Sequence, residues 1–457
     1  MQTGIKFGTD GFRGIIGKNF NFDNVKKITL ATAEYLKSGT VIIGYDSRLD
    51  ADKYAKFSSD LLAAYGFDVL LSEHIAPTPV IAFAARNTKN SSGALMFTAS
   101  HNPPDYLGIK FIPSYGGPAT SDITKEIERI IENKIFTLEE KEGIVLKKDF
   151  SKMYFEQIDS LIDFEAIKNN PPKIIYDGLF SASIGYFDKI LKEKNISFES
   201  YNDHFDPNFG GFLPEPKPEF LKHTKQGYIT VANDGDADRY GVIDEQGNYV
   251  SPNIILAILL KYLKEKGMEG AVVKTVGVSG LVDAVAKKLN VEIIETPVGF
   301  KWIGEAMRLN KTIIGGEDSG GLSTGNHISE KDGIYANLLI IEAIAKTNKP
   351  LYQLKEEIID FAGVEFVQDR VDIKLDDDTQ KEKIISEIKM EENFANQKII
   401  QKNEIDGVKL YLEDNLTKIL IRKSGTEPLL RFYIETDKNS KLTSIKEFIK
   451  GYMFIVK

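Results

Sequence analysis

The feature that most constrains the fold of this chain is a pattern of segments that occurs three times. Each copy has a short apolar run, a polar or glycine-containing turn, an amphipathic helical stretch and a second apolar run, and the copies occupy residues 40–71, 173–201 and 271–295. This order is typical of a βαβ unit, in which two parallel strands are joined by a helix. We therefore predict three α/β domains. The copies share a pattern rather than identical residues, and we favour an internal triplication over three unrelated α/β domains.

The last part of the chain has a different pattern. Residues 409–412, 419–422 and 429–435 predict antiparallel strands, and a helix is expected over 442–452. A chain of 457 residues, 42% of them hydrophobic, can form several cores. We expect an α/β protein of four domains, three related α/β mixed-sheet domains and a smaller C-terminal α+β domain. The predicted domain ranges are 1–149, 150–251, 252–364 and 365–457.

Composition excludes several classes of function. The net charge of −9 argues against nucleic acid or an anionic membrane as the main partner, so an anionic substrate would need a local group of cations. The chain has no cysteine, which excludes disulfides, thiolate metal sites and a cysteine nucleophile. Residues 1–12 lack the apolar run of a secretory signal, and the apolar run 254–263 is too short to span a bilayer. We expect a cytoplasmic protein.

Three carboxylates follow a predicted strand at residues 228–232. In Asp234-Gly-Asp236-Ala-Asp238-Arg239, the acidic residues alternate along an extended segment, so their side chains can converge on one cation. Oxygen-only ligands favour a hard ion, and Mg²⁺ accepts few carboxylates while completing its shell with water or phosphate oxygens. We predict an Mg²⁺ site, against the simpler alternative of a solvated acidic turn.

The acidic segment also has an EF-hand alternative. Glu245 occupies the twelfth position counted from Asp234, where an EF-hand loop places a bidentate glutamate. The sixth position, which requires glycine for a sharp turn, is Arg239, and both flanks predict strands rather than helices. We therefore favour a strand-flanked Mg²⁺ loop.

A candidate nucleophile lies at the end of another apolar run. Ser100 stands in Thr98-Ala-Ser-His-Asn-Pro103 after residues 94–97, so it would occupy the exposed end of a buried strand, where ligands bind in open α/β sheets. The same residues could form an ordinary turn. The Gly-x-Ser-x-Gly pattern of esterases is absent at this serine, which weakens a hydrolase interpretation.

A basic loop joins two of the C-terminal strands. Arg422-Lys-Ser-Gly-Thr-Glu-Pro428 offers hydroxyls, cations and a glycine that allows close backbone approach, and Arg431 follows on the next strand. These groups suit a phosphate dianion, because guanidinium and loop amide groups form charge-assisted hydrogen bonds with it. The alternative is a plain hairpin turn.

Two further glycine-rich segments are less specific by themselves. They are Gly8-Thr-Asp-Gly-Phe-Arg13-Gly14 and Gly316-Glu-Asp-Ser-Gly-Gly321. Glycine-rich turns before helices are common connectors, and a glutamate and a serine two residues apart could simply cap a helix.

Together and in this order, the five segments resemble the α-D-phosphohexomutase family, and phosphoglucomutases within it most closely. The resemblance spans nearly the whole chain and implies four domains around a central cleft. It implies that Ser100 becomes a phosphoserine, that Asp234, Asp236 and Asp238 bind Mg²⁺ together with a phosphoserine oxygen, and that Arg239 contacts the phosphoryl group. The residues that the resemblance assigns to the substrate are Glu317 and Ser319 at sugar hydroxyls, and Arg422, Ser424, Gly425, Thr426 and Arg431 at the phosphate that is not transferred.

The implied reaction moves a phosphoryl group between the C1 and C6 oxygens of a glucose phosphate through a hexose 1,6-bisphosphate. Mg²⁺ neutralises charge in both half-reactions. Candidates for acid/base and electrostatic work are Arg13, Lys110 and Lys331.

The choice of sugar depends on segments around Lys301 and His327, which resemble glucose-type enzymes. Bacterial phosphomannomutases and phosphoglucosamine mutases usually have histidine where this chain has Gly321, whereas Asp318 replaces a glutamate that is common in glucose-type enzymes. A preference for mannose or glucosamine phosphate on the same scaffold therefore remains an alternative.

Two other classes of protein remain open at this stage. A metal-dependent serine phosphatase would use Ser100 and the acidic loop but leaves the basic loop at Arg422 unexplained. A non-catalytic sugar-phosphate binding protein would need neither Ser100 nor the three converging carboxylates. We expect small sugar phosphates as partners, no nucleic acid or membrane, and a monomer or dimer.

Overall fold

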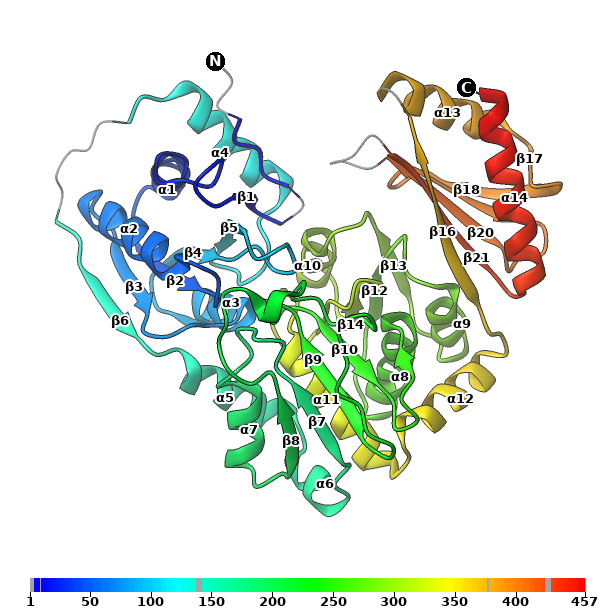
Figure 1. The fold of residues 1–457 in the computed structure, drawn as a ribbon, viewed down its shortest axis with the longest axis horizontal. Helices are drawn as coiled ribbons and strands as arrows, with labels where there is room; N and C mark the ends of the chain where they lie inside the picture. The colour runs from blue at the N-terminus through cyan, green and yellow to red at the C-terminus, as the bar shows by residue number, and fades with distance from the viewer. Residues whose placement is uncertain (1–3, 9, 137–141, 376–377, 424–428, 457) are drawn as a thin grey trace.

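Four β-sheets organise the chain, and they confirm the predicted fold class (Figure 1). The computed structural model describes residues 4–8, 10–136, 142–375, 378–423 and 429–456. We call the units built on the four sheets domains I to IV in chain order. Within the described ranges, no helix combines the length and the apolar character needed to cross a membrane.

Domain I is built on a six-stranded mixed sheet in the order β1-β5-β4-β2-β3-β6. The strands β4, β2, β3 and β6 are parallel, and β5 and β1 run antiparallel to their neighbours. Its elements are β1 (Phe12–Ile15), α1 (Phe22–Leu36), β2 (Thr40–Tyr45), α2 (Ala51–Ala64), β3 (Asp68–Ser72), α3 (Thr78–Asn87), β4 (Ser91–Phe97), β5 (Tyr106–Pro113), α4 (Ser121–Asn133) and β6 (Val145–Lys148).

Domain II has a five-stranded sheet in the order β11-β10-β9-β7-β8, in which β9, β7 and β8 are parallel and β10 is antiparallel to β9. Its elements are α5 (Ser151–Leu161), α6 (Phe164–Asn169), β7 (Ile174–Asp177), α7 (Phe187–Glu193), β8 (Phe198–Tyr201), the 3₁₀ turn η1 (Phe209–Gly211), β9 (Ile229–Asn233), β10 (Tyr240–Ile243) and β11 (Tyr249–Val250).

Domain III has a four-stranded sheet in the order β13-β12-β14-β15, with β15 antiparallel to β14. Its elements are α8 (Pro252–Glu265), β12 (Ala271–Thr275), α9 (Gly280–Lys288), β13 (Ile293–Thr296), α10 (Phe300–Leu309), β14 (Thr312–Gly316), β15 (Leu322–Thr324), α11 (Gly333–Thr347) and α12 (Leu351–Ala362).

Domain IV has a fully antiparallel sheet in the order β16-β21-β20-β19-β18-β17. Its elements are β16 (Val367–Lys374), α13 (Asp378–Met390), β17 (Asn393–Phe394), β18 (Gln397–Asn403), β19 (Val408–Leu412), β20 (Lys418–Lys423), β21 (Leu429–Thr436) and α14 (Asn439–Val456).

Domains I to III share one strand order. In each, the first strand of the βαβ unit lies in the middle, the second lies on one side, and a third parallel strand on the other side forms a hairpin with an antiparallel fourth. The four-strand runs are β3-β2-β4-β5, β8-β7-β9-β10 and β13-β12-β14-β15. This common topology supports the internal triplication, and it gives each domain one hairpin turn at the carboxyl end of a central parallel strand.

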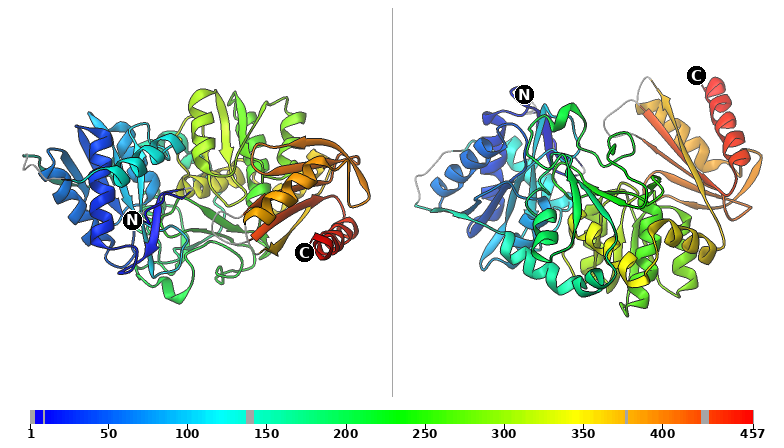
Figure 2. Two further views of the ribbon diagram at one scale, coloured as in Figure 1. Left: turned by 90° about the horizontal axis from the view of Figure 1, so that it is seen from above. Right: turned by 60° about the horizontal axis from the view of Figure 1, so that its bottom comes forward.

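The four domains are joined in two different ways. One continuous apolar core runs from Val80 and Ile81 of domain I through Tyr154 of domain II to Leu256 and Leu339 of domain III. Domain IV has an apolar core of its own. Figures 1 and 2 place domains I and IV at opposite ends of the molecule, with domain IV beside domain III.

Ion pairs join domain IV to domain III. Lys409 Nζ lies 2.7 Å from a Glu295 oxygen, and Lys418 Nζ lies 2.9 Å from an Asp283 oxygen. The buried Lys274 bridges the same two carboxylates from within domain III, at 2.9 Å from Asp283 and 3.2 Å from Glu295. Ion pairs therefore contribute to the contact between domains III and IV.

Candidate active site

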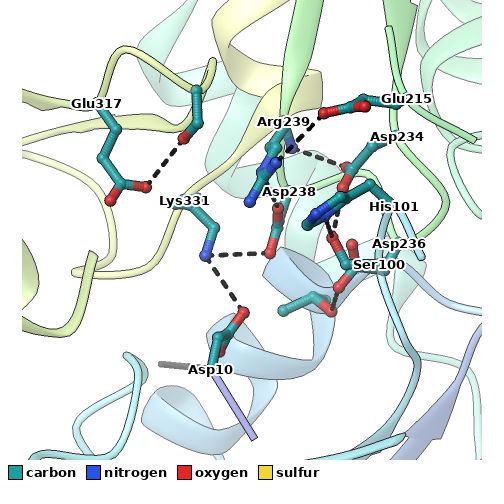
Figure 3. A network of polar contacts seen from close by, with 12 residues as sticks. Asp10, Ser100, His101, Glu215, Asp234, Asp236, Asp238, Arg239, Glu317 and Lys331 are labelled. Atoms are coloured by element: carbon teal, nitrogen blue, oxygen red, sulfur yellow. Dashed lines mark hydrogen bonds and ion pairs between the residues drawn. The ribbon is translucent and has the colours of Figure 1, made fainter. Parts of the chain in front are cut away.

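Ser100 lies in the hairpin turn between β4 and β5 and is 1% exposed. Its Oγ donates a 2.6 Å hydrogen bond to Asp234 Oδ2 in the corresponding turn of domain II (Figure 3). The backbone at Ser100 has a φ of +50°, a left-handed conformation that costs free energy for a residue other than glycine. The backbone N–H of Ser100 is held by Thr98 Oγ1 at 2.8 Å. The turn thus holds the hydroxyl at the boundary between two domains.

Arg48, a residue that the sequence analysis did not single out, holds this turn in place. Its guanidinium is buried and donates four hydrogen bonds to backbone carbonyls of the serine turn, with lengths of 2.6 to 3.0 Å. Asp46 Oδ2 lies 3.3 Å from Arg48 Nε and balances its charge. The sequence does show that Asp46-Ser47-Arg48 follows the predicted strand β2. Only the structure shows that β2 pairs with β4, which brings Arg48 next to the turn that contains Ser100.

The acidic segment forms the turn between β9 and β10. Carboxylate oxygens of Asp234, Asp236 and Asp238 lie within 4.8 Å of one another, and all three residues are buried. Opposite ligands of an Mg²⁺ ion at 2.0–2.1 Å are about 4 Å apart. Asp236 Oδ1 and Asp238 Oδ1 are buried and have no hydrogen-bond partner among the described residues. Buried carboxylate oxygens without partners cost folding free energy, and a bound cation would offset that cost. This donor set therefore fits a small hard cation.

The EF-hand alternative is excluded by the same geometry. The acidic turn is flanked by the strands β9 and β10 rather than by helices. Glu245 lies outside the turn, where its carboxylate accepts hydrogen bonds from the backbone N–H groups of Leu351 at 3.0 Å and Tyr352 at 3.4 Å. This glutamate therefore caps α12.

Two lysines predicted as site residues lie against the acidic cluster. Lys110 Nζ on β5 is 2.8 Å from both Asp236 and Asp238 and 2.7 Å from Asp10. Lys331 Nζ is 3.2 Å from Asp238 and 3.5 Å from Asp10 (Figure 3). Burial opposes the charge of both lysines, but Asp10 and the other carboxylates outweigh it and raise the pKa of each above its ordinary value. Both therefore carry a positive charge at neutral pH.

The carboxyl groups of the cluster respond to burial and to these cations in different ways. Burial, reinforced by Asp238 and Asp236, raises the pKa of Asp234 well above its ordinary value. Burial also opposes the ionisation of Asp236, but Lys110 and the hydroxyl of Thr78 outweigh it and lower its pKa to about 2. Glu330, next to Lys331, has its pKa raised by burial to about 8.

Two arginines and a histidine complete the surroundings of Ser100. Arg13 Nη1 donates to Asn102 Oδ1 at 2.6 Å in the serine turn. Arg239 Nε lies 4.0 Å from Asp238 Oδ1 and is buried without a hydrogen-bond partner among the described residues. His101 Nδ1 lies 3.3 Å from Ser100 Oγ, and the charge of Arg239 together with burial lowers the pKa of His101 well below its ordinary value. His101 is thus a neutral neighbour of the hydroxyl, and the sequence analysis gave it no role.

The predicted sugar-binding residues are only partly brought together. Glu317 and Ser319 lie in the β14–β15 turn, where Ser319 Oγ donates to Glu317 Oε2 at 3.3 Å and Gly299 N donates to Glu317 Oε1 at 3.1 Å. Lys301, at the start of α10, is half-buried with its Nζ 5.4 Å from the centre of the Trp302 ring.

His327 lies in a buried network rather than among the charged groups at Ser100. Its Nε2 is 2.8 Å from Asp332 Oδ2, which also accepts from Tyr154 Oη at 2.9 Å. Asp332 Oδ1 in turn accepts from the backbone N–H of Tyr335 and so caps α11 at its start. In the described structure His327 therefore supports the helix that follows Lys331.

Domain IV contributes two of the predicted phosphate ligands to the described structure. Arg422 on β20 and Arg431 on β21 are directly paired across the antiparallel ladder, so their side chains lie on one face of the sheet. Arg422 Nη2 is 2.8 Å from Asp406 Oδ2, which also accepts from the backbone N–H of Val298 in domain III at 3.0 Å. The predicted ligands Ser424, Gly425 and Thr426 lie outside the described residues.

Comparison with known proteins shows which family has this arrangement of domains. Models of the phosphoglucomutase/phosphomannomutase α/β/α domains I, II and III match residues 4–138, 152–247 and 251–361, and the model of the C-terminal domain of the same family matches residues 385–451. A phosphoglucomutase/phosphomannomutase of Thermococcus kodakarensis is 30% identical over 96% of each chain. A phosphoglucosamine mutase of Methanocaldococcus jannaschii is 32% identical over 99% of this chain and 98% of that one.

A solved structure shows the same fold. It belongs to a Thermus thermophilus protein to which phosphomannomutase activity has been attributed, and it superposes with a TM-score of 0.86 at 31% identity, covering 99% of this chain and 100% of that one. The chain therefore belongs to the phosphoglucomutase/phosphomannomutase family and is a phosphohexomutase.

Replacing Arg48 with methionine is expected to lower kcat at least about tenfold and to lower the unfolding temperature. The change removes four charge-assisted hydrogen bonds, each of about 1.5–3 kcal/mol, and leaves Asp46 buried without its counter-ion. Steady-state kinetics and thermal unfolding measure the two effects. The control is Arg129→Met on α4, because Arg129 is exposed and pairs with the neighbouring exposed Glu126. Wild-type kcat in Arg48→Met would refute the role of Arg48 in holding the turn.

Proposed function

We propose that this phosphohexomutase interconverts glucose 1-phosphate and glucose 6-phosphate through a phosphoserine at Ser100 and a hexose 1,6-bisphosphate. The observation that carries the proposal is the 2.6 Å contact between Ser100 Oγ and a buried cluster of three aspartates, with Lys110 and Lys331 at its edge. A hydroxyl beside a cation site that two ammonium groups also contact suits the transfer of a dianionic phosphoryl group. The proposal keeps sugar phosphates as partners and a cytoplasmic location.

In the proposal, Asp234, Asp236 and Asp238 hold Mg²⁺ together with a phosphoserine oxygen of Ser100. A divalent cation bound there would supply charge neutralisation at the phosphoryl oxygens. The two buried carboxylate oxygens without partners and the raised pKa of Asp234 both support a cation at this place.

The chain's own groups would divide the remaining work. In each transfer the bond between phosphorus and one oxygen would break as the bond to the accepting hydroxyl oxygen forms, and the proton of that hydroxyl would pass, in net, to the released oxygen. Negative charge is spread over the phosphoryl oxygens during the transfer. Lys110, Lys331, Arg13 and Arg239 would stabilise that charge. The raised pKa values of both lysines support an electrostatic role for them rather than the role of a base.

The far end of the substrate would be bound by domains III and IV. Glu317 and Ser319 would bind sugar hydroxyls, with Lys301 and His327 in the neighbouring segments. Arg422 and Arg431, with Ser424, Gly425 and Thr426, would bind the phosphate that is not transferred. Two arginines placed directly opposite each other on a sheet repel, and a bound dianion would remove that repulsion.

The choice of glucose is supported by the space at Gly321. A Cβ at this position would lie 2.4 Å from Lys331 Cδ, so the stem of Lys331 packs directly against Gly321. A histidine here would displace Lys331 from Asp238. The second candidate substrate is glucosamine phosphate, because several similar curated proteins, including the one from Methanocaldococcus jannaschii, are phosphoglucosamine mutases.

A comparison of substrates tests this choice. We expect kcat/KM to be highest for glucose 1-phosphate, lower for mannose 1-phosphate and lowest for glucosamine 1-phosphate, under identical activation by the hexose bisphosphate. The C2 epimer keeps its hydroxyl, so a side activity on mannose is expected, whereas an amine at C2 changes the charge at that position. A larger kcat/KM for glucosamine 1-phosphate would overturn the choice of sugar and leave the mutase assignment standing.

Arg422→Ala is expected to raise KM for glucose 1-phosphate at least about tenfold, with a smaller effect on kcat. The change removes charge-assisted bonds to the distant phosphate, each of about 1.5–3 kcal/mol. Arg370→Ala is the matched control, because Arg370 is an exposed arginine of the same sheet that pairs with Asp372. If KM and kcat were both unchanged in Arg422→Ala, the basic loop would be only a turn.

A further inference from the structure

A cavity of about 310 Å³ lies between domains I and III and is lined in part by the segment that leads to Lys331. It is separate from the acidic cluster and from Arg422 and Arg431 of domain IV, since none of these residues lines it. The side chains in its lining that carry polar groups are Arg86, Tyr115, Arg308, Thr324, His327 and Ser329.

Two arginines face each other across the two domains at this cavity. Arg86, in the last turn of α3, donates to the carbonyl of His327 at 2.8 Å. Arg308, near the end of α10, donates to Ser329 Oγ at 3.3 Å, and its guanidinium lies 3.7 Å from the centre of the Tyr115 ring. Among the described residues, neither arginine has a carboxylate within 4.0 Å.

This chain pairs other arginines, such as Arg48, Arg129 and Arg370, with a carboxylate. It has 67 acidic residues against 58 lysines and arginines, so acidic partners are in excess. Arg308 is half-buried, and burial lowers its pKa although the charges of Glu305 and Glu330 act in the opposite direction. An anion in the cavity would compensate both guanidinium groups, and arginine pairs bind phosphate through parallel hydrogen bonds.

The walls of the cavity are closely packed where the domains meet. A Cβ at Gly117 of domain I would lie 2.6 Å from the Ser329 carbonyl oxygen, and a Cβ at Gly304 of α10 would lie 2.4 Å from the same atom. The Ser329 backbone is thus held between two glycines that allow no larger residue without movement. The segment 327–329, to which both arginines are hydrogen-bonded, therefore has a fixed position, and such pre-organisation favours binding.

We propose that this cavity is a second anion site, which binds a small phosphate-bearing molecule between Arg86 and Arg308. The volume accommodates inorganic phosphate or the phosphate end of a small metabolite, and Ser329 adds a hydroxyl group beside the two guanidinium groups. This site is independent of the phosphate site proposed at Arg422, which belongs to a different domain.

Occupancy of the cavity would act on the active site through one short segment. The two arginines hold the His327 carbonyl and the Ser329 hydroxyl, and Lys331, two residues further on, contacts Asp10 and Asp238. A bound anion that draws the guanidinium groups toward itself changes these contacts. Binding at the cavity and binding at the active site are then coupled, each changing the affinity of the other by the same factor.

Calorimetric titration of the full chain with inorganic phosphate tests the proposal. The Arg422→Ala variant serves as the background, because it weakens the anion site proposed in domain IV. We expect Arg422→Ala still to bind phosphate, and the added change Arg86→Gln or Arg308→Gln to raise Kd at least about tenfold each. Arg86 is exposed at a helix end, so Arg86→Gln should fold; Arg308→Lys, which keeps the charge, should raise Kd less than Arg308→Gln.

Arg129→Gln is the control for loss of one positive charge and should leave Kd unchanged. A titration with ribose 5-phosphate distinguishes the source of the phosphate group: tighter binding than inorganic phosphate identifies a phosphorylated metabolite, and equal or weaker binding identifies free phosphate. Unchanged Kd for phosphate in both Arg86→Gln and Arg308→Gln, or no binding to Arg422→Ala, would overturn the proposal. Neither result depends on mutase activity, so the proposed function is tested separately.

Discussion

Ser100→Ala is expected to lower the mutase kcat by about 10⁴-fold or more while leaving the fold intact. The proposed reaction passes through a bond to Ser100 Oγ, and loss of a nucleophile from a catalytic set costs about four to six orders of magnitude. Alanine and serine have similar difficulty with a φ of +50°, so the substitution should add little backbone strain. The measurement is a coupled assay with glucose 1-phosphate, accompanied by a thermal unfolding curve.

Ser92→Ala provides a matched control on the same strand. Ser92 lies near the start of β4, where its Oγ donates to the Ser38 carbonyl at 2.6 Å, far along the strand from the serine turn. It should retain wild-type kcat. Turnover by Ser100→Ala within tenfold of the wild-type rate would rule out a phosphoserine mechanism at this residue.

The second large effect is expected when the divalent cation is removed, because enzymatic activity should then be lost. Chelation should abolish activity, Mg²⁺ should restore it, and Asp236→Asn should weaken Mg²⁺ at least about tenfold. The reason is electrostatic: three buried carboxylates in contact with phosphate need a cation, and an amide oxygen at position 236 supplies a weaker ligand without the charge. The lost carboxylate also held Lys110 at 2.8 Å, so kcat should fall even at saturating Mg²⁺.

The metal prediction is measured by calorimetric titration of Mg²⁺ into the metal-free protein. Asp60→Asn, in which an exposed aspartate of α2 loses its pairing with Lys56, controls for the loss of one negative charge. The same Mg²⁺ affinity in Asp236→Asn and in the wild type would show that the metal, if required, is bound elsewhere.

Much of the fold could be predicted from hydrophobic patterning. The predicted βαβ units at residues 40–71 and 271–295 correspond within one residue to β2-α2-β3 and β12-α9-β13. In domain IV the strands β19, β20 and β21 were predicted, whereas β16, β17 and β18 were not. What patterning could not supply is the partner of a strand. β5 is a mostly apolar run, and the sequence does not say that it folds back antiparallel on β4 and places Ser100 in the turn between them.

The chemical groups of the site could be recognised one by one in the sequence, but the sequence did not show which of them lie close together in the fold. Ser100 and Asp234 are 134 residues apart, and their contact depends on two hairpin turns in different domains. Arg48 and Asp10 received no role from the sequence, because a turn residue gains one only when the opposite strand is known. His327 was named from the family resemblance alone, and the sequence did not show that its partner Asp332 also accepts a hydrogen bond from Tyr154, 178 residues away, in a buried network.

The central claim is that Ser100 carries the phosphoryl group, and intact-mass spectrometry tests it most directly. The protein is incubated with glucose 1,6-bisphosphate and separated from small molecules, and its intact mass is measured. The modified residue is then located by peptide fragmentation. We predict one phosphate-sized increment in the wild type, located on Ser100, and its loss on later addition of glucose 1-phosphate or glucose 6-phosphate, without steady release of inorganic phosphate. An increment on any residue other than Ser100, its persistence in Ser100→Ala, or its loss to water at the rate of turnover would contradict the mechanism.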